Sequence, residues 1–249
     1  FSYIDTEWIS GVIMTIDDVT SLMNLENNKK EFFQNASHEL KSPLTCIIGY
    51  QQMITEGILD TKEQILDSAN KSLKEAIRMN DILSDMLSLA TIEARPTSLK
   101  ENINPKAIIE DVVITLSIEA KKNNIKISTD LDDNTLFASR TEFNEVVRNL
   151  IDNAIKYTED DGHVTFTVRT NDRHLYISVA DNGPGISDSD KKKIFDRFYR
   201  VDKARTRQKG GFGLGLSLAQ QIVLALKGTI VVKDNQPKGT IFEVKITGV

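Results

Sequence analysis

The chain has 249 residues, of which 40% are hydrophobic and 27% are charged, and its formal net charge at pH 7 is −5. This length and balance predict about two domains, each large enough for its own core. The negative charge argues against a nucleic-acid-binding surface over the whole molecule, so we expect no nucleic-acid partner. No apolar run approaches the ~18–20 residues of a membrane span, and we expect no membrane contact by these residues.

The single cysteine, Cys46, excludes an intramolecular disulfide and fits a reducing compartment. We expect it to pack in a helix as a small hydrophobic residue. The sequence begins at Phe1 rather than Met and has no visible signal peptide, so we expect a longer parent protein.

In chain order, residues 8–16 are rich in β-forming side chains and predict one strand. A helix should follow from about residue 21 to Glu56, ended by Gly57. Thr61-Lys-Glu-Gln64 is a capping box that predicts the start of a second helix. Pro96 should close that helix.

Both helices carry apolar residues in alternating steps of three and four, the pattern of a coiled coil. In the first helix this seam comprises Phe33, Ser37, Leu40, Leu44, Ile47, Gln51 and Ile54. In the second it comprises Leu66, Ala69, Leu73, Ala76, Asn80, Leu83, Leu87 and Ala90. A short connection predicts an antiparallel hairpin, and its uncovered apolar face predicts a dimeric four-helix bundle built from two chains.

After Pro96 strands and helices alternate. Helices are expected at 104–123, 139–157, 187–195 and 213–226, and strands at 125–131, 135–138, 164–169, 175–180, 229–233 and 240–246. This order predicts an α/β sandwich, with helices on one face of a largely antiparallel sheet. The predicted fold class is therefore α+β, a helical hairpin followed by the sandwich.

His38 is the first candidate functional residue, because it falls just beside the seam and its imidazole should reach solvent. Pro43 removes the backbone donor that would bond the carbonyl of Glu39, which loosens the helix nearby. A reactive histidine there suggests a phosphoacceptor. The alternative is an ordinary solvated histidine, and the hypothesis needs a phosphate donor elsewhere in the chain.

One stripe of the 139–157 helix carries Asn149, Asn153 and Lys156, opposite its apolar side. Two amides and an ammonium suit a hydrated Mg²⁺ and a polyphosphate, because Mg²⁺ keeps several waters and accepts few protein oxygens. The alternative is a solvated polar face.

Two glycine-rich loops follow, and they hold six of the thirteen glycines. Asp181-Asn-Gly-Pro-Gly-Ile186 comes at the end of a strand, where its carboxylate can accept a hydrogen bond from adenine N6 while glycines allow close approach. Gly210-Gly-Phe-Gly-Leu-Gly215 opens a helix, where backbone donors suit phosphates. Each loop alone could be an ordinary turn.

A basic segment of roughly thirty residues separates these loops, longer than most loops in compact domains. Its cations are Lys191, Lys192, Lys193, Arg197, Arg200, Lys203, Arg205, Arg207 and Lys209. Phe195 and Phe198 could anchor it while it moves, which suggests a lid over a phosphate site. The alternative is a solvated surface.

Taken together, these segments resemble the sensor histidine kinases of two-component signalling, over nearly everything after residue 26. The matching motifs are Ser37–Thr45 (H-box), Asn149–Tyr157 (N-box), Asp181–Ile186 and Gly211–Leu216 (glycine boxes), Phe195–Arg200 (aromatic box) and Gly239–Phe242 (terminal motif). The start of the chain resembles, much more weakly, the last strand of a PAS sensor domain, as in kinases of the phosphate-regulon or cell-wall type.

The resemblance implies a PAS-like remnant at 1–20, a dimerisation and phosphotransfer hairpin at 21–96, and a Bergerat-type ATP-binding domain at 97–249. It makes His38 the phosphoacceptor, with Glu39 and Ser42 beside it in the catalytic machinery. It also implies ATP and Mg²⁺ as cofactors, with Asn149 and Asn153 as metal ligands. The implied nucleotide contacts are Asn149, Asn153, Lys156, Tyr157, Asp181, Gly183, Gly185, Ile186, Arg200, Gly211, Gly213, Leu214, Gly215 and Thr240.

By the same resemblance the chain is a homodimer that phosphorylates His38 and passes the phosphoryl group to an aspartate of a response-regulator receiver domain. It would form the cytoplasmic part of a membrane-bound bacterial sensor. Ser42 departs from the family's usual threonine or asparagine, which leaves dephosphorylation of the regulator open. Phe212 stands where the second glycine box often has a small residue or threonine. The rival functions are a Bergerat ATPase that is not a kinase and a degenerate kinase that only binds a partner.

Overall fold

The computed structural model describes residues 2–6, 9–13, 17–94, 99–171, 173–201 and 212–247. These residues belong to two compact units, Phe1–Ser42 and Pro43–Val249. Within these ranges, no helix combines the length and the apolar character that crossing a membrane requires.

The first unit contains a β-hairpin and the start of a long helix. Strands β1 (Ser2–Thr6) and β2 (Ile9–Ile13) pair antiparallel. The prediction of one strand over 8–16 therefore found β2 and missed β1, while residues 8 and 14–16 lie outside the described residues. Helix α1 (Thr20–Thr55) continues through Pro43.

The turn between α1 and α2 (Lys62–Ala94) forms as its sequence predicts. Gly57 has a φ of 70°, which glycine adopts without strain. Thr61 Oγ1 accepts from the Gln64 amide at 3.2 Å, and Gln64 Oε1 accepts from the Thr61 amide at 3.3 Å. The predicted capping box is confirmed.

Within the second unit, Gln51 Nε2 donates to Ser72 Oγ at 3.3 Å, as expected where α2 folds back along the end of α1. Pro96, the predicted end of the second helix, lies outside the described residues. Cys46 is exposed, so the prediction that it packs as a small hydrophobic residue was wrong.

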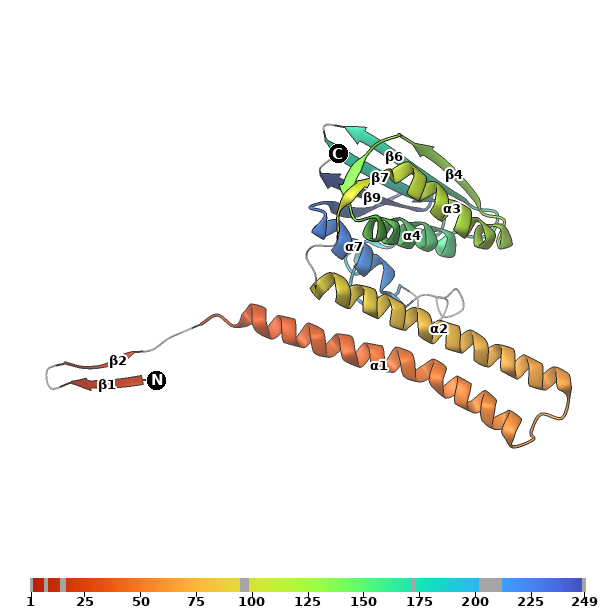
Figure 1. Cartoon of the computed structure of the whole chain (residues 1–249), viewed down its shortest axis with the longest axis horizontal. Helices are drawn as coiled ribbons and strands as arrows, with labels where there is room; N and C mark the ends of the chain where they lie inside the picture. Colours follow the sequence, from red (N-terminus) through yellow and green to blue (C-terminus); the bar gives the residue numbers. More distant parts are fainter. Residues whose placement is uncertain are drawn as a thin grey trace. The chain divides into compact units, whose positions relative to one another are not determined.

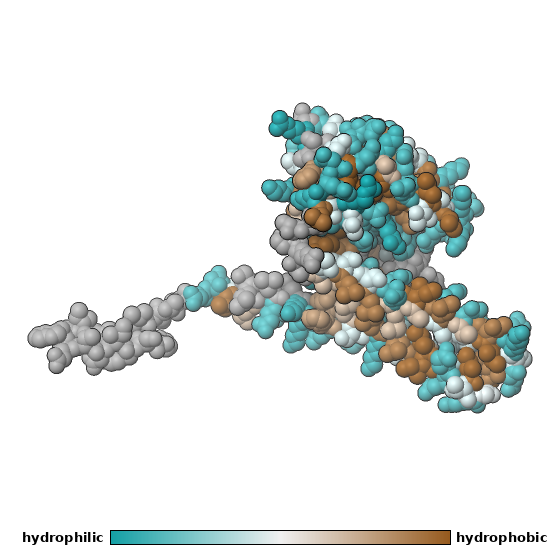
Figure 2. Space-filling model, in the orientation of Figure 1, coloured by the Kyte–Doolittle hydropathy of each residue, from teal (hydrophilic) through white to brown (hydrophobic). Residues whose placement is uncertain are grey.

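The predicted seam of α2 does not form the contact inside the hairpin. Among the side chains of α2 that the structure describes, the buried ones are Ser68, Ser72, Ile82 and Leu89. The seam leucines are exposed instead, by 52% at Leu66, 58% at Leu73, 44% at Leu83 and 68% at Leu87. Figure 2 shows hydrophobic residues on the surface of this helical hairpin. An apolar stripe thus remains uncovered in the single chain.

The rest of the second unit is the predicted sandwich. Its central sheet has the order β4-β6-β7-β9-β8, with β4 parallel to β6 and the other pairs antiparallel. These strands are β4 (Lys126–Leu131), β6 (His163–Asn171), β7 (His174–Asp181), β8 (Thr229–Asp234) and β9 (Thr240–Thr247). Helices α3 (Pro105–Lys122), α4 (Arg140–Tyr157) and α7 (Gly215–Ala225) cover one face of the sheet (Figure 1).

The core explains this arrangement. Buried and more exposed residues alternate along β6 and β7, which presents one face of each strand to the helices. The apolar side of α4 packs on that face, with Phe143, Val147 and Leu150 fully buried. Side-chain caps start the helices where the sequence predicts: Asn104 Oδ1 accepts from the Ala107 amide at 3.2 Å, and Ser139 caps α4.

Two details differ from the prediction. Strand β3 (Glu101–Ile103), which was not predicted, pairs with β5 (Leu136–Ala138) in a separate two-stranded sheet. Three residues are too few for an alternating pattern to emerge. Helix α5 (Asp188–Lys191) is shorter than the predicted 187–195 helix, because the chain turns after Lys191.

Candidate nucleotide site and phosphoacceptor helix

A cavity of about 910 Å³ lies against α4, beside the loops that follow β7 and precede α7. It collects most of the residues predicted from separate motifs. Those that line it are Asn149, Asn153, Lys156, Tyr157, Asp181, Gly185, Ile186, Arg200, Gly213, Gly215 and Thr240. Gly183 and Leu214 are buried beside the cavity without lining it, and Gly211 lies outside the described residues.

The amide of Asn149 is oriented by its own helix. Its Nδ2 donates to the Glu145 carbonyl oxygen at 2.9 Å and approaches Glu145 Oε1 at 3.4 Å. Its Oδ1 therefore turns toward Gly215, where an added Cβ would lie only 2.5 Å away. The absence of a side chain at Gly215 leaves this oxygen room to act as an acceptor or ligand.

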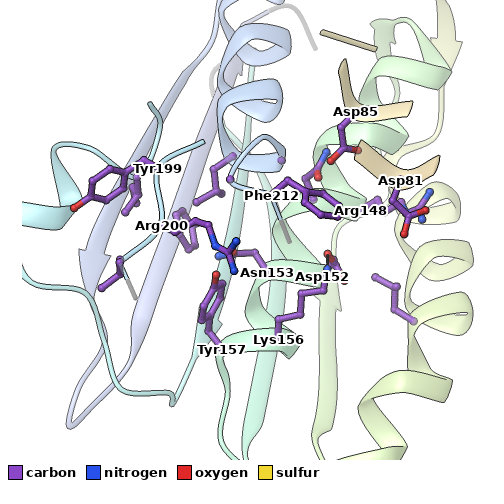
Figure 3. A pocket seen from close by; sticks show the side chains of 18 of the residues that line it. Asp81, Asp85, Arg148, Asp152, Asn153, Lys156, Tyr157, Tyr199, Arg200 and Phe212 are labelled. Atoms are coloured by element: carbon purple, nitrogen blue, oxygen red, sulfur yellow. Dashed lines mark ion pairs between the residues drawn. The ribbon is translucent and has the colours of Figure 1, made fainter. Parts of the chain in front are cut away.

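One turn farther along α4, the cavity becomes positively charged. Asn153, Lys156, Tyr157 and Arg200 lie close together in Figure 3. Lys156 Nζ pairs with Asp152 Oδ2 at 2.7 Å, and both side chains are about three-quarters buried, being 24% and 28% exposed. This ion pair holds the Lys156 ammonium at the cavity wall, where it can contact an anionic ligand.

Asp181 is a buried acceptor at the end of β7, only 4% exposed. Its Oδ1 accepts from the Gly183 amide at 2.8 Å and from the Thr240 amide at 3.1 Å. Burial raises the pKa of this carboxyl, and the two backbone donors offset only part of that rise. The bonds fix the carboxylate while its remaining lone pairs face the cavity, where they suit an amine donor.

The loop before α7 is attached to the aromatic segment. Gly213 has a φ of 74°, and an added Cβ would lie 2.5 Å from the Tyr199 carbonyl oxygen. The Phe198 amide donates to the Gly213 carbonyl at 2.9 Å. Phe195 contacts Phe242 of β9 edge to face, with 6.5 Å between ring centroids. The predicted anchoring role of Phe195 fits this packing.

In the described part of the basic segment, Lys191 has a structural role that was not predicted. Lys191 Nζ bridges Asp188 Oδ1 at 2.8 Å and Asp234 Oδ2 at 2.7 Å, so it ties the segment to β8. Lys203, Arg205, Arg207 and Lys209, the centre of the predicted lid, lie outside the described residues. The lid stays a prediction.

Sequence reasoning missed one wall of the cavity, which comes from α2. Its lining residues recur every three or four positions and are Lys74, Ile77, Arg78, Asp81, Ser84, Asp85 and Ser88. Burial, with help from the nearby Glu145 carboxylate, raises the pKa of Asp85 to about 6. Most of these residues directly follow a residue of the predicted seam, so they form a second stripe along α2 that is visible in the sequence. Nothing in the sequence indicates what that stripe faces.

α4 adds two further acidic residues to the cavity, Glu145 and Asp152, which sequence reasoning also missed. Their spacing from Asn149 and Lys156, four residues in each case, could have identified them. No cluster of three or more His, Cys, Asp or Glu side chains suited to a metal ion occurs within the described ranges.

His38 lies on α1 and its side chain is exposed, as predicted. Glu39 is half-buried and Ser42 is exposed. Ser37, the residue before His38, donates through Oγ to the Phe33 carbonyl oxygen at 2.8 Å. The histidine is therefore accessible to a reagent or to another domain.

Two family models match the chain in the order that the motifs suggest. Residues 28–95 match the His Kinase A (phospho-acceptor) domain, and residues 138–248 match the histidine kinase-, DNA gyrase B- and HSP90-like ATPase. The chain belongs to the sensor histidine kinases. The helix that carries His38 and the domain that holds the cavity are thus the two parts expected of that family.

The relatives agree with this assignment. The sensor protein CiaH of Streptococcus pneumoniae serotype 4 is 44% identical over 243 residues, which are 96% of this chain and 55% of CiaH. The chain therefore spans about half the length of this curated relative. The solved structure of the Acinetobacter baumannii histidine kinase AdeS has a TM-score of 0.70 and 27% identity, covering 85% of this chain and 98% of AdeS.

A second solved structure is the histidine kinase ThkA in complex with the response regulator protein TrrA. It has a TM-score of 0.62 and 27% identity, and it covers 100% of this chain and 74% of ThkA. The hairpin and the sheet domain of the present kinase thus match those of known histidine kinases. The predicted fold class is confirmed.

Proposed function

We propose that the chain transfers the γ-phosphoryl group of ATP to His38 and then to an aspartate of a response regulator. The cavity carries the proposal, because an adenine acceptor, two amides and two cations from three separate motifs converge on it. In this assignment Asp181 accepts from the adenine amine. Lys156 and Arg200 neutralise the phosphates, since phosphoryl transfer depends on positioning and charge stabilisation.

In the first step, a nitrogen lone pair of the neutral His38 imidazole attacks the γ-phosphorus. A phosphorus–nitrogen bond forms, the bond to the bridging β–γ oxygen breaks, and ADP leaves. The other ring nitrogen then loses its proton to Glu39 or to solvent. In the second step, a receiver-domain carboxylate oxygen attacks the phosphorus and the phosphorus–nitrogen bond breaks. The ring takes back a proton from Glu39 or from solvent, which leaves a neutral histidine.

Mg²⁺ belongs to this proposal, and the residues present fit it. The Asn149 amide nitrogen is engaged with Glu145, so its oxygen is the atom left for a ligand. Asn153 lies one turn farther on the same wall. These two amides would hold the ion, which when bound would neutralise charge on the phosphates.

Radiolabelled ATP tests the first step. The chain incubated with γ-³²P-ATP should acquire acid-labile, alkali-stable label, and His38→Gln should acquire none while still binding ATP. His163→Gln is the matched control, because it removes an exposed histidine of β6 and should keep the label. Label that survives in His38→Gln contradicts the assignment. Steady phosphate release without a phosphoprotein would indicate a non-kinase ATPase, and failure to bind ATP would indicate a binding module.

The response regulator as acceptor rests on the ThkA–TrrA complex and on the exposure of His38. Phosphorylated chain mixed with a panel of receiver domains should lose its label to one of them within seconds. A receiver whose acceptor aspartate is replaced by asparagine should leave the label on the chain. Whether the chain also dephosphorylates the regulator is a separate question. Ser42→Thr adds a methyl group that restricts the hydroxyl rotamer, and it tests whether this raises the rate of dephosphorylation.

The homodimer rests on the uncovered stripe of α2. Leu73 and Leu87 are more than half exposed in the single chain, and a second hairpin would bury them in a four-helix bundle. Leu73→Glu combined with Leu87→Glu should give a monomer in light scattering. Lys71→Glu, on the same helix but outside the stripe, should stay dimeric. A monomeric unmodified chain would contradict the proposal.

The domain bounds 1–20, 21–96 and 97–249 remain part of the proposal, as does the PAS-like origin of the first. We also propose a cytoplasmic position in a membrane-bound parent, because the relatives are named sensor proteins and the proposed reaction uses ATP. Fractionation of cells that produce the complete parent protein would test the location.

A further inference from the structure

Arg200 and Tyr199 are consecutive residues whose side chains point in different directions. In Figure 3 the head group of Arg200 lies beside Asn153 and Tyr157, while the Tyr199 ring extends away from them. Both side chains are half-buried. A contact that fixes Tyr199 therefore also fixes the backbone from which Arg200 enters the cavity.

The Tyr199 hydroxyl is held by a carboxylate of α5. It donates to Asp190 Oδ1 at 2.6 Å, a short bond of the kind that a charged acceptor makes. Ser187 Oγ donates to the other oxygen, Asp190 Oδ2, also at 2.6 Å. The bonds from Ser187 and Tyr199 lower the pKa of Asp190, and the bond to Asp190 raises the pKa of Tyr199. At neutral pH the carboxylate is therefore charged, and the phenol keeps the proton that it donates.

Helix α5 is short, so it can hold Tyr199 only if it is itself fixed to the sheet. The residue after Asp190 makes that attachment. Lys191 Nζ pairs with Asp234 Oδ2 of β8 at 2.7 Å, and the Lys191 side chain is only 15% exposed. The acceptor of the tyrosine and the anchor of the helix are thus adjacent residues, and the contacts run from β8 through α5 to Tyr199.

The backbone before Arg200 is also held by the loop that precedes α7. Phe198 has a φ of 62°, which is uncommon for a bulky residue and persists only where the surroundings determine it. Its amide donates to the Gly213 carbonyl at 2.9 Å, and Gly213 leaves free the space that the Tyr199 carbonyl oxygen needs. Tyr199 is thus fixed through both its backbone and its hydroxyl.

We propose that Tyr199 and Asp190 are positioning residues that aim the Arg200 guanidinium into the cavity, toward the phosphates of ATP. Orientation matters because arginine contacts a phosphate through a rigid, planar fork of donors, so its direction decides how many bonds it makes. The inference rests on the proposed function for the contact between Arg200 and phosphate.

Calorimetry with ATP and Mg²⁺ tests the proposal without any phosphoryl transfer. Tyr199→Phe removes one hydroxyl and keeps the ring, and it should weaken ATP binding about 3- to 10-fold, the range for one lost hydrogen bond. In an Arg200→Ala background the same change should have no further effect, because it acts through the guanidinium. Adenosine, which has no phosphate, should bind Tyr199→Phe and the unmodified chain equally in an NMR titration. Tyr176→Phe is the matched control, since it removes an exposed hydroxyl from β7 and should leave ATP binding unchanged.

Substitutions of Asp190 test the other end of the bond. Asp190→Ala should cause the same loss as Tyr199→Phe, whereas Asp190→Asn keeps an acceptor oxygen and should retain most of the affinity. Unchanged ATP affinity in Tyr199→Phe, an equal loss in the Arg200→Ala background, or a matching loss for adenosine would each overturn the proposal. A chain that binds no ATP would overturn it together with the proposed function. A chain that binds ATP but acquires no phosphohistidine would contradict the proposed transfer alone.

Discussion

Asp85 makes the stability of this kinase depend on pH in an unusual direction. Its pKa of about 6 in the folded chain, against an ordinary 3.8, means that the folded state binds a proton more tightly than the unfolded state. Stability due to this group is therefore greatest below pH 4, falls as the pH rises toward 6, and stays low above it. The difference between the two pKa values corresponds to about 3 kcal/mol at pH 8.

Asp85→Asn removes the charge and keeps the shape, so it should stabilise the chain by up to about 3 kcal/mol at pH 8. At pH 5 the gain should be about half as large, because the native carboxyl is already mostly protonated there. Urea denaturation at both pH values measures the free energies of unfolding. Asp67→Asn is the control, since this carboxylate is exposed and pairs with Lys71, also exposed.

Two results would refute this reasoning. One is an equal gain from Asp85→Asn at pH 5 and pH 8, which would mean that titration of the carboxyl is not its source. The other is no gain at pH 8, which would mean that Glu145 and burial do not penalise the charge.

Three further predictions concern the site and the hairpin. Asp181→Asn keeps the bonds to backbone donors but removes the charge that faces the adenine, so calorimetry should find ATP bound about 10-fold more weakly; unchanged affinity would exclude the adenine contact. Gly215→Ala should weaken Mg²⁺-dependent ATP binding at least as much, because its Cβ would displace Asn149 Oδ1, whereas Gly49→Ala meets open space and should not. Thr61→Ala removes the cap of α2 and should cost about 1 kcal/mol in urea denaturation; a change below a few tenths would show that the capping box adds little.

The sequence was most informative where one local rule determines the structure. The capping box Thr61-Lys-Glu-Gln64 identified the start of α2, because its side-chain oxygens bond backbone amides only a few residues away. Period-two alternation identified β6 and β7, since one face of the sheet is buried. The cavity residues that were recognised from the sequence each belong to a motif with its own chemistry.

What the sequence missed depends on contacts between distant segments. The α2 wall, with Arg78 against Phe212, joins residues more than a hundred positions apart, and neither belongs to a pattern that names the other. The seam of α2 was identified as apolar, but Ser68 and Ser72 rather than the leucines face the hairpin interior.

The α2 wall bears on the search for inhibitors of this kinase. A compound screened against the isolated ATP-binding domain would meet a cavity that lacks Ile77, Arg78 and the other contributions of the hairpin. A compound screened against the longer chain could instead fill the space between Arg78, Phe212 and the nucleotide. Because that space is built by a segment outside the shared ATPase domain, such a compound could distinguish this kinase from gyrase and chaperone ATPases of the same fold.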